Sequence, residues 1–107
     1  MTLKAKDSIL NQIKYSIWEV LPESQIILFG SRARGENLQD SDYDLLIIVD
    51  KQFDSPEKLK YQALIRKQLA VKNILADILI QSKSDIEVKK NLPGHIVRSA
   101  MLEGVQV

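Results

Sequence analysis

The strongest constraint on the fold is the run Tyr43–Val49, which reads Y-D-L-L-I-I-V and is largely apolar at consecutive positions. A strand that is apolar on both faces needs cover on both faces, as in sheets with helices packed against them. Two shorter runs, Gln25–Phe29 (Q-I-I-L-F) and Ala76–Gln81 (A-D-I-L-I-Q), predict two further strands. The sequence therefore predicts a small sheet of about three strands with a buried centre.

Segments of helical periodicity separate the predicted strands. Apolar residues recur every three or four positions before Pro22, which ends the first helix because its ring clashes with the preceding turn. Ser55 and Pro56 are typical of a helix start, as N-cap and first helical residue, and Gly104 is typical of a helix end. Helices are predicted at Leu3–Leu21, Ser55–Lys72 and Gly94–Leu102, with a short turn or helix at Asp85–Lys90 capped by Ser84.

The order of these elements predicts an α/β fold, α-β-α-β-α-β-α, in which the second α is a short helix or loop. About a dozen residues separate the first two strands, which is near the lower limit for a crossover, so this pair is predicted to be antiparallel. A full helix joins the second and third strands, which suits a parallel pair with a right-handed crossover. We expect a mixed sheet in one domain spanning residues 1–107.

The composition excludes several classes of protein. The absence of cysteine excludes disulfide scaffolds and cysteine-based zinc or nucleophilic sites, and the single histidine, His95, is too few for a multi-histidine metal site. A formal net charge of +1 excludes a strongly basic nucleic-acid-binding domain. The sequence shows neither a bilayer-spanning stretch nor a secretory signal, so we expect a cytoplasmic protein without a membrane contact.

Residues that can hold a phosphate follow the first predicted strand. Gly30 allows a sharp turn and a close ligand approach, and the amides of a helix that starts here would point outward at an anion. The Ser31 hydroxyl can hold a phosphate oxygen, and Arg32 or Arg34 can add positive charge. The sequence therefore predicts an anion site at this turn.

Three aspartates are candidates for a metal site. Asp42 and Asp44 alternate at the start of the second strand, so both carboxylates are expected on one face. Asp77 lies inside the third strand, where an unpaired charge is costly. Carboxylate oxygens select Mg²⁺ or Mn²⁺, and three such acids can hold two cations about 4 Å apart for an in-line phosphoryl displacement.

Each feature also has an ordinary explanation. A single Asp-x-Asp pair can be a polar turn, Gly30-Ser31 can be any strand-to-helix turn, and Asp77 can protect a sheet edge from aggregation. The combination favours a metal-dependent site, because three carboxylates near one apolar sheet face are costly. The glycine spacing from Gly30 to Gly35 resembles a P-loop, but Glu36-Asn37 follows where that motif needs Lys and Ser or Thr.

A family resemblance rests on two motifs, Gly30-Ser31-Arg32-Ala33-Arg34-Gly35 and Ser41-Asp42-Tyr43-Asp44-Leu45. Together they resemble the signature of the minimal nucleotidyltransferase (MNT) group, within the DNA polymerase β-type nucleotidyltransferase superfamily. Asp77 matches the position of the third metal carboxylate, and Ile96–Val105 is similar to the end of such domains. The resemblance implies the nucleotidyltransferase fold over nearly the whole chain.

The resemblance also implies a reaction, the Mg²⁺-dependent transfer of AMP from ATP to a hydroxyl with loss of pyrophosphate. Asp42 and Asp44 would bind metal, and Asp77 would bind a second ion and help to deprotonate the acceptor. The implied nucleotide-binding residues are Gly30, Ser31, Arg32 and Arg34.

Small relatives of this kind are antitoxins that add AMP to a tyrosine of a HEPN-type toxin, so the resemblance implies such a partner and a homo- or hetero-oligomer. We expect no domain that holds the acceptor within these 107 residues, so the acceptor, or the rest of its site, is expected to come from a partner protein. Two alternatives stay open: a binding module that neutralises a partner by contact, with catalysis weak or lost, and an RNA-modifying nucleotidyltransferase. The near-zero net charge argues against nucleic acid.

Four other features carry less weight. His95 is expected to lie at the surface or cap a helix, and Arg98 to be a solvated charge or a contact to a partner. Tyr15 and Trp18 are expected in the core or at a subunit contact. The segment Glu57–Lys72 has five cationic side chains against one acid, which is typical of a solvated helix face but could also dock an acidic partner or RNA.

Overall fold

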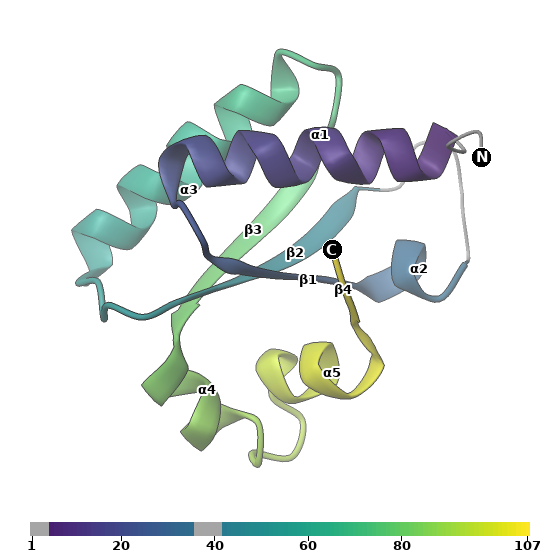
Figure 1. The fold of residues 1–107 in the computed structure, drawn as a ribbon. Coiled ribbons are helices and arrows are strands. Elements are labelled where there is room, and N and C mark those ends of the chain that lie inside the picture. Colours follow the sequence, from purple (N-terminus) through teal and green to yellow (C-terminus); the bar gives the residue numbers. More distant parts are fainter. Residues whose placement is uncertain (1–4, 36–41) are drawn as a thin grey trace.

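The computed structural model describes residues 5–35 and 42–107, so Ser41 and the pair Glu36-Asn37 lie outside the described residues. Helices pack on both faces of one sheet, with α1 and α3 on one side and α4 and α5 on the other (Figure 1). The helices are α1 (Ala5–Val20), α2 (Gly30–Ala33), α3 (Ser55–Ala70), α4 (Lys83–Lys89) and α5 (Ile96–Glu103). The strands are β1 (Gln25–Phe29), β2 (Tyr43–Val49), β3 (Ala76–Ser82) and β4 (Val105–Gln106).

The sheet has four strands in the order β3-β2-β1-β4. The antiparallel β1–β2 pair and the parallel β2–β3 pair are both as predicted. The prediction of about three strands missed β4, which pairs antiparallel with β1 through Ile27 and Leu28. Because β4 spans only 2 residues, it is too short to show the alternation by which a strand is recognised in sequence.

Alternation along the strands divides the core into two clusters. One cluster joins the sheet to α1 and α3, and its fully buried members include Leu28, Leu45 and Ile80. The other lies on the α4 and α5 side and is smaller, with Leu46 fully buried at its centre. A strand that is buried on both faces was the main constraint read from the sequence, and β2 is such a strand.

Two helices begin at a different cap from the one predicted. The N-cap of α3 is Asp54 instead of Ser55, and its carboxylate accepts a hydrogen bond of 2.8 Å from the amide of Glu57. The N-cap of α4 is Ser82 instead of Ser84, and its hydroxyl accepts from the amide of Asp85 at 3.1 Å. Ser, Asp and Asn cap helices almost equally well, so the sequence alone does not choose between neighbouring caps.

His95 caps a helix as expected, whereas Trp18, expected in the core or at a subunit contact, is not in the core. His95 is the N-cap of α5, and its Nδ1 accepts from the amide of Val97 at 3.1 Å. The indole of Trp18 is partly exposed and donates to the carbonyl of Ser24 at 2.9 Å. Tyr15 is 64% exposed, so it is not a core residue. Within the described residues, no helix has the length and apolarity to cross a bilayer.

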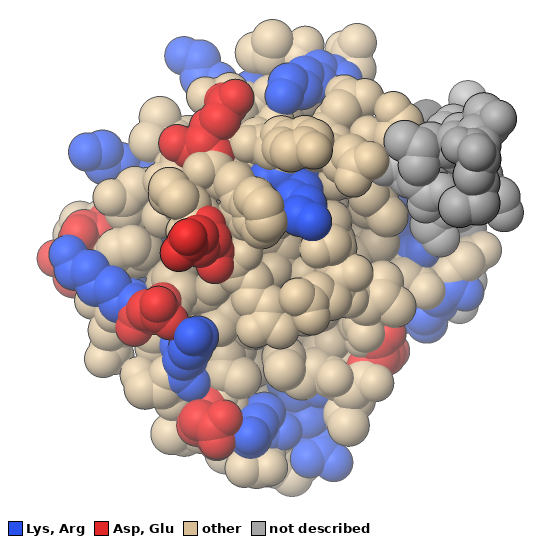
Figure 2. All heavy atoms as spheres, viewed as in Figure 1, with Lys and Arg blue, Asp and Glu red and all other residues tan. Residues whose placement is uncertain are grey.

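The described surface carries both signs of charge close together. On the face shown in Figure 2, Lys and Arg alternate with Asp and Glu, and uncharged residues fill much of the middle. This mixing agrees with a formal net charge of +1 and gives this face no broad basic field.

The buried centre of β2 leads to a stability prediction. Leu45 is fully buried, so Leu45→Ala should lower the free energy of unfolding by about 2–5 kcal/mol through lost apolar contacts and a cavity. Leu59→Ala is the matched control, because Leu59 is 66% exposed and its truncation should change stability by less than about 0.5 kcal/mol. Urea denaturation measures both values, and equal losses would contradict the assigned core.

Candidate functional site

Two of the three predicted aspartates face each other across neighbouring strands. Asp44 of β2 is the register partner of Asp77 of β3, so their Cα atoms lie directly opposite in the parallel pair. Neighbouring strands are about 4.8 Å apart, which brings the two side chains within reach of a shared ion. Because side chains alternate along a strand, Asp44 is on the same face of β2 as Leu46, which belongs to the smaller core cluster. The acidic pair therefore lies on the face of the sheet that α4 and α5 cover.

The charge of Asp44 is influenced by both of the other acids. Burial raises the pKa of Asp44 above its usual value, and the negative charges of Asp77 and then Asp42 raise the pKa further. The guanidinium of Arg34 acts in the opposite direction and lowers this pKa. The predicted meeting of Asp44 with Asp77 is therefore present, and Asp42 is near enough to act on Asp44; Asp42 and Asp77 are exposed and Asp44 is half-buried.

The described acids do not form a complete metal site by themselves. Within residues 5–35 and 42–107, no group of three or more acids or histidines is arranged to hold a metal ion by itself. Donor chemistry still fits a hard divalent cation, because carboxylate oxygens that repel one another are stabilised by a positive ion between them. Any ion held here would need further oxygen ligands from a bound substrate or from water.

Gly30 places the short α2 turn directly against this acidic cluster. Its φ of 74° lies in the left-handed region, and a Cβ atom at this position would overlap the Asp44 carboxylate. A side chain here would therefore force that carboxylate to move. The predicted proximity of the Gly30-Ser31 turn to Asp44 is observed, with Ser31 half-buried in the first turn of α2.

The two arginines of the motif lie in different environments. The guanidinium of Arg32 lies over the ring of Tyr43, 4.2 Å from the ring centroid, and Tyr43 belongs to the core cluster under α1 and α3. Arg34 is near enough to Asp44 to lower its pKa. In this conformation Arg34 therefore adds positive charge to the acidic cluster, whereas the nucleotide-binding role of Arg32 stays a prediction.

One contact at this site was not predicted from the sequence. Nη1 of Arg34 is 3.2 Å from Oε1 of Glu103, at the end of α5, so the turn after β1 is tied to a helix far along the chain. No periodicity or motif spacing reports a pair separated by 69 residues. Glu103 was therefore missed as a neighbour of the site.

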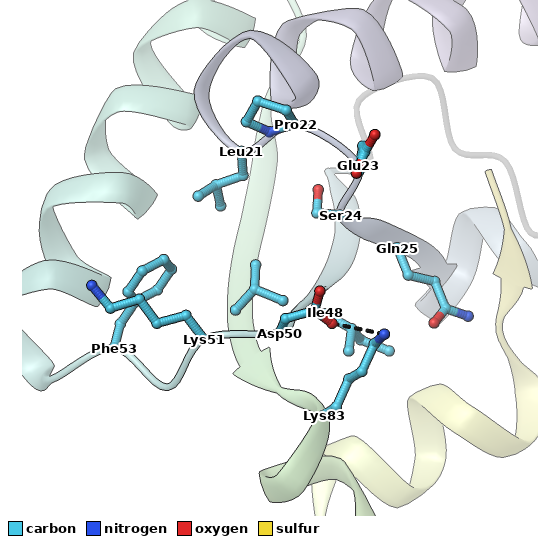
Figure 3. Close-up of a pocket in the computed structure, with 11 residues that line it drawn as sticks. Leu21, Pro22, Glu23, Ser24, Gln25, Ile48, Asp50, Lys51, Phe53 and Lys83 are labelled. Atoms are coloured by element: carbon cyan, nitrogen blue, oxygen red, sulfur yellow. Dashed lines mark ion pairs between the residues drawn. The ribbon is translucent and has the colours of Figure 1, made fainter.

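The described cavities lie at the opposite end of β2. One has a volume of about 450 Å³ and lies between the α1–β1 turn, the end of β2 and Lys83 (Figure 3). A smaller one of about 370 Å³ shares Gln25, Ile48 and Lys83 with it. Lys83 spans the first cavity to Asp50 with an ion pair of 2.7 Å. Four residues of extended strand, about 13 Å, separate Ile48 from Asp44, so neither cavity belongs to the acidic cluster.

Comparisons with known proteins agree with this architecture. A search of curated protein sequences gave no significant match. One similar solved structure is a toxin–antitoxin complex with AMP-PNP, at 18% identity and a TM-score of 0.62, covering 90% of this chain and 69% of that one. Another is a complex of a tri-AMPylated HEPN toxin from Shewanella oneidensis with its MNT antitoxin, at 15% identity and a TM-score of 0.60, covering 94% and 70%.

A third similar structure is a variant of the MntA–HpeT toxin–antitoxin complex, at 16% identity and a TM-score of 0.52, covering 99% of this chain and 72% of that one. At these identities the likeness shows a shared fold, that of the MNT antitoxins. The family model described as a nucleotidyltransferase domain matches residues 10–105, which is nearly the whole chain. This chain therefore belongs to the nucleotidyltransferase domain family.

Proposed function

We propose that this chain is a Mg²⁺-dependent nucleotidyltransferase that moves AMP from ATP to a hydroxyl of a partner protein, as the antitoxin of a HEPN-type toxin. The observation that carries the proposal is the meeting of Asp44, Asp77 and the Gly30 turn at one end of the sheet. Structures of similar fold add support, since one contains AMP-PNP and another a tri-AMPylated HEPN toxin.

Asp42, Asp44 and Asp77 would hold Mg²⁺, together with oxygens of the triphosphate. Bound there, the ion would neutralise charge on the triphosphate during the displacement. The present structure favours this role because Asp44 is half-buried beside two further carboxylates, an arrangement that costs free energy until a cation joins it.

The remaining residues would position the substrates. Ser31 and the amides of the α2 turn would hold β- and γ-phosphate oxygens, and Arg34 would supply positive charge beside them. The acceptor oxygen would attack the α-phosphorus, the bond from that phosphorus to the β-phosphate oxygen would break, and pyrophosphate would leave. Asp77, exposed on the edge strand β3, would take the proton of the acceptor hydroxyl.

A second candidate function is neutralisation of the partner by contact alone. It is favoured by one observation, that no described group of acids is arranged to hold a metal ion without help. The two functions differ in whether suppression of the partner depends on the acidic cluster.

Transfer of AMP provides the direct test of catalysis. The chain is incubated with Mg²⁺, α-labelled ATP and the protein encoded by the neighbouring gene, and label on that protein is counted. We expect Asp42→Asn combined with Asp44→Asn to lower transfer more than about a hundredfold, because metal ligands are lost. Asp50→Asn is the control, since Asp50 lies beyond the other end of β2 and pairs with Lys83.

Equal transfer by the double variant and the wild type would contradict the catalytic role. Suppression of the partner's activity that survives the double substitution, without any transfer by the wild type, would establish neutralisation by contact instead.

The repulsion at Asp44 predicts that the acid needed for the proposed reaction lowers the stability of the metal-free fold. Because the folded-state pKa of Asp44 is raised above its ordinary value of 3.8, its charge opposes folding at neutral pH, and this penalty disappears as pH falls through the raised pKa. Asp44→Asn should therefore raise Tm at pH 7 without metal, and the gain should vanish near pH 3. Mg²⁺ with ATP should raise Tm of the wild type only. A lower Tm for metal-free Asp44→Asn at pH 7 would refute this account.

Gly30 can be tested against a glycine of the same backbone conformation. Gly35 also has a positive φ, of 76°, but a Cβ atom there would meet nothing within 4 Å. Both Gly30→Ala and Gly35→Ala carry the strain of a left-handed residue, about 1–2 kcal/mol. Only Gly30→Ala displaces the Asp44 carboxylate, so AMP transfer should fall at least about tenfold below that of Gly35→Ala. Matching transfer rates would show that the contact with Asp44 does not matter.

A further inference from the structure

Helix α3 and its C-cap residue expose three large apolar side chains and fully bury two. Ile65 and Leu69 are fully buried against the sheet and α1. Leu59 is 66% exposed, Leu64 41% and Val71, the C-cap residue, 79%. Single exposed apolar residues are common, but several on one helix mark a surface that contacts another molecule.

These side chains form two adjoining stripes along the outer face of α3. Residues three and four apart lie above one another on a helix, so such spacings identify a shared face. One stripe is Lys60, Leu64, Lys67 and Val71, and the stripe beside it is Leu59, Ala63, Arg66 and Ala70. All eight residues are exposed, so the outer face of α3 presents apolar and basic side chains together.

The cations on this outer face have no acidic partner among the described residues. The ion pair of Lys58 at 3.8 Å goes to Asp85, and Lys72 donates to the buried hydroxyl of Ser16 at 2.6 Å, so these two lysines are engaged within the fold. Lys60, Arg66 and Lys67 form no described ion pair. The one acid of α3, Glu57, is used in the capping box of Asp54. The stripes therefore carry uncompensated positive charge.

The stripes lead toward the acidic cluster. After Val71 the chain turns into β3, and Leu75 in this turn is 63% exposed. The carbonyl of Leu75 accepts a hydrogen bond of 2.9 Å from the amide of Tyr43, at the start of β2. Asp77 follows Leu75 by two residues. Asp77 faces the α4 and α5 side, so a molecule that covers the outer face of α3 would reach Asp77 around the edge strand β3 (Figure 1).

We propose that the α3 surface, defined as Leu59, Lys60, Leu64, Lys67, Val71 and Leu75, docks the acceptor protein through an acidic segment with an apolar face. This inference rests on the proposed function, since it names the chemistry of the partner surface. Docking here places the partner beside the edge strand β3, so that a hydroxyl of the partner can reach around this strand to Asp77 on the other face.

The composition of the α3 surface selects this occupant. A second copy of the chain would bring like charges together, which is unfavourable. RNA would satisfy the cations but would leave the leucine and valine side chains without apolar contacts, and the α3 surface offers no aromatic ring for base stacking. A partner helix with carboxylates opposite Lys60 and Lys67 and apolar residues between them would pair with the cations and also cover the apolar side chains.

The test measures the affinity of the folded chain for the protein encoded by the neighbouring gene. Lys67→Glu combined with Val71→Ser should raise Kd at least about tenfold, because one charge pair is reversed and one apolar contact is lost. The matched control is Lys90→Glu combined with Val88→Ser on the α4 side, where Val88 is 65% exposed. This control should change Kd less than about twofold.

Transfer of AMP at saturating partner separates docking from damage to the acidic cluster. The α3 variant should then reach the wild-type rate, with the change confined to KM for the partner. Equal Kd values for the α3 variant and the control, or no binding of the partner by the wild type, would overturn the docking surface. The docking surface would also be overturned if the wild type bound single-stranded RNA and the α3 variant lost RNA binding but kept its affinity for the partner. Partner binding without any transfer would instead contradict the proposed function.

Discussion

The mutual repulsion of carboxylates at the start of β2 and β3 is the interaction on which the account depends. Parallel pairing puts Asp44 opposite Asp77, and Asp42 lies two residues earlier. A purely structural protein would gain by replacing such a half-buried acid with a neutral residue. The fold instead retains the charge beside Gly30, whose missing side chain leaves room for the Asp44 carboxylate.

The rest of the architecture keeps these groups in place. Helix α3 connects β2 to β3 as a crossover, so the same helix that fixes the register of Asp77 also presents the basic and apolar α3 surface. On the opposite side, Glu103 at the end of α5 pairs with Arg34, which lies near the acids. Elements on both faces of the sheet thus contribute to the end that holds the acids, and the two cavities described above lie at the other end of β2.

Most of this arrangement was readable from sequence, for identifiable reasons. The apolar run of β2, the alternation of Asp42 and Asp44 and the length of the β2–β3 connection fix strand direction and face, so the meeting of Asp44 with Asp77 was predictable. Contacts without a local sequence pattern could not be predicted. Strand β4 is too short to show alternation, and the Arg34–Glu103 pair joins distant segments. The caps at Asp54 and Ser82 were missed because adjacent residues cap equally well.

A crystal structure of the chain with Mg²⁺ and AMP-PNP tests the central claim most directly. The account predicts metal density among the carboxylates of Asp42, Asp44 and Asp77, with the triphosphate lying along the turn that begins at Gly30. A triphosphate seated instead in the cavity beside Lys83, with those three acids free of metal, would contradict it.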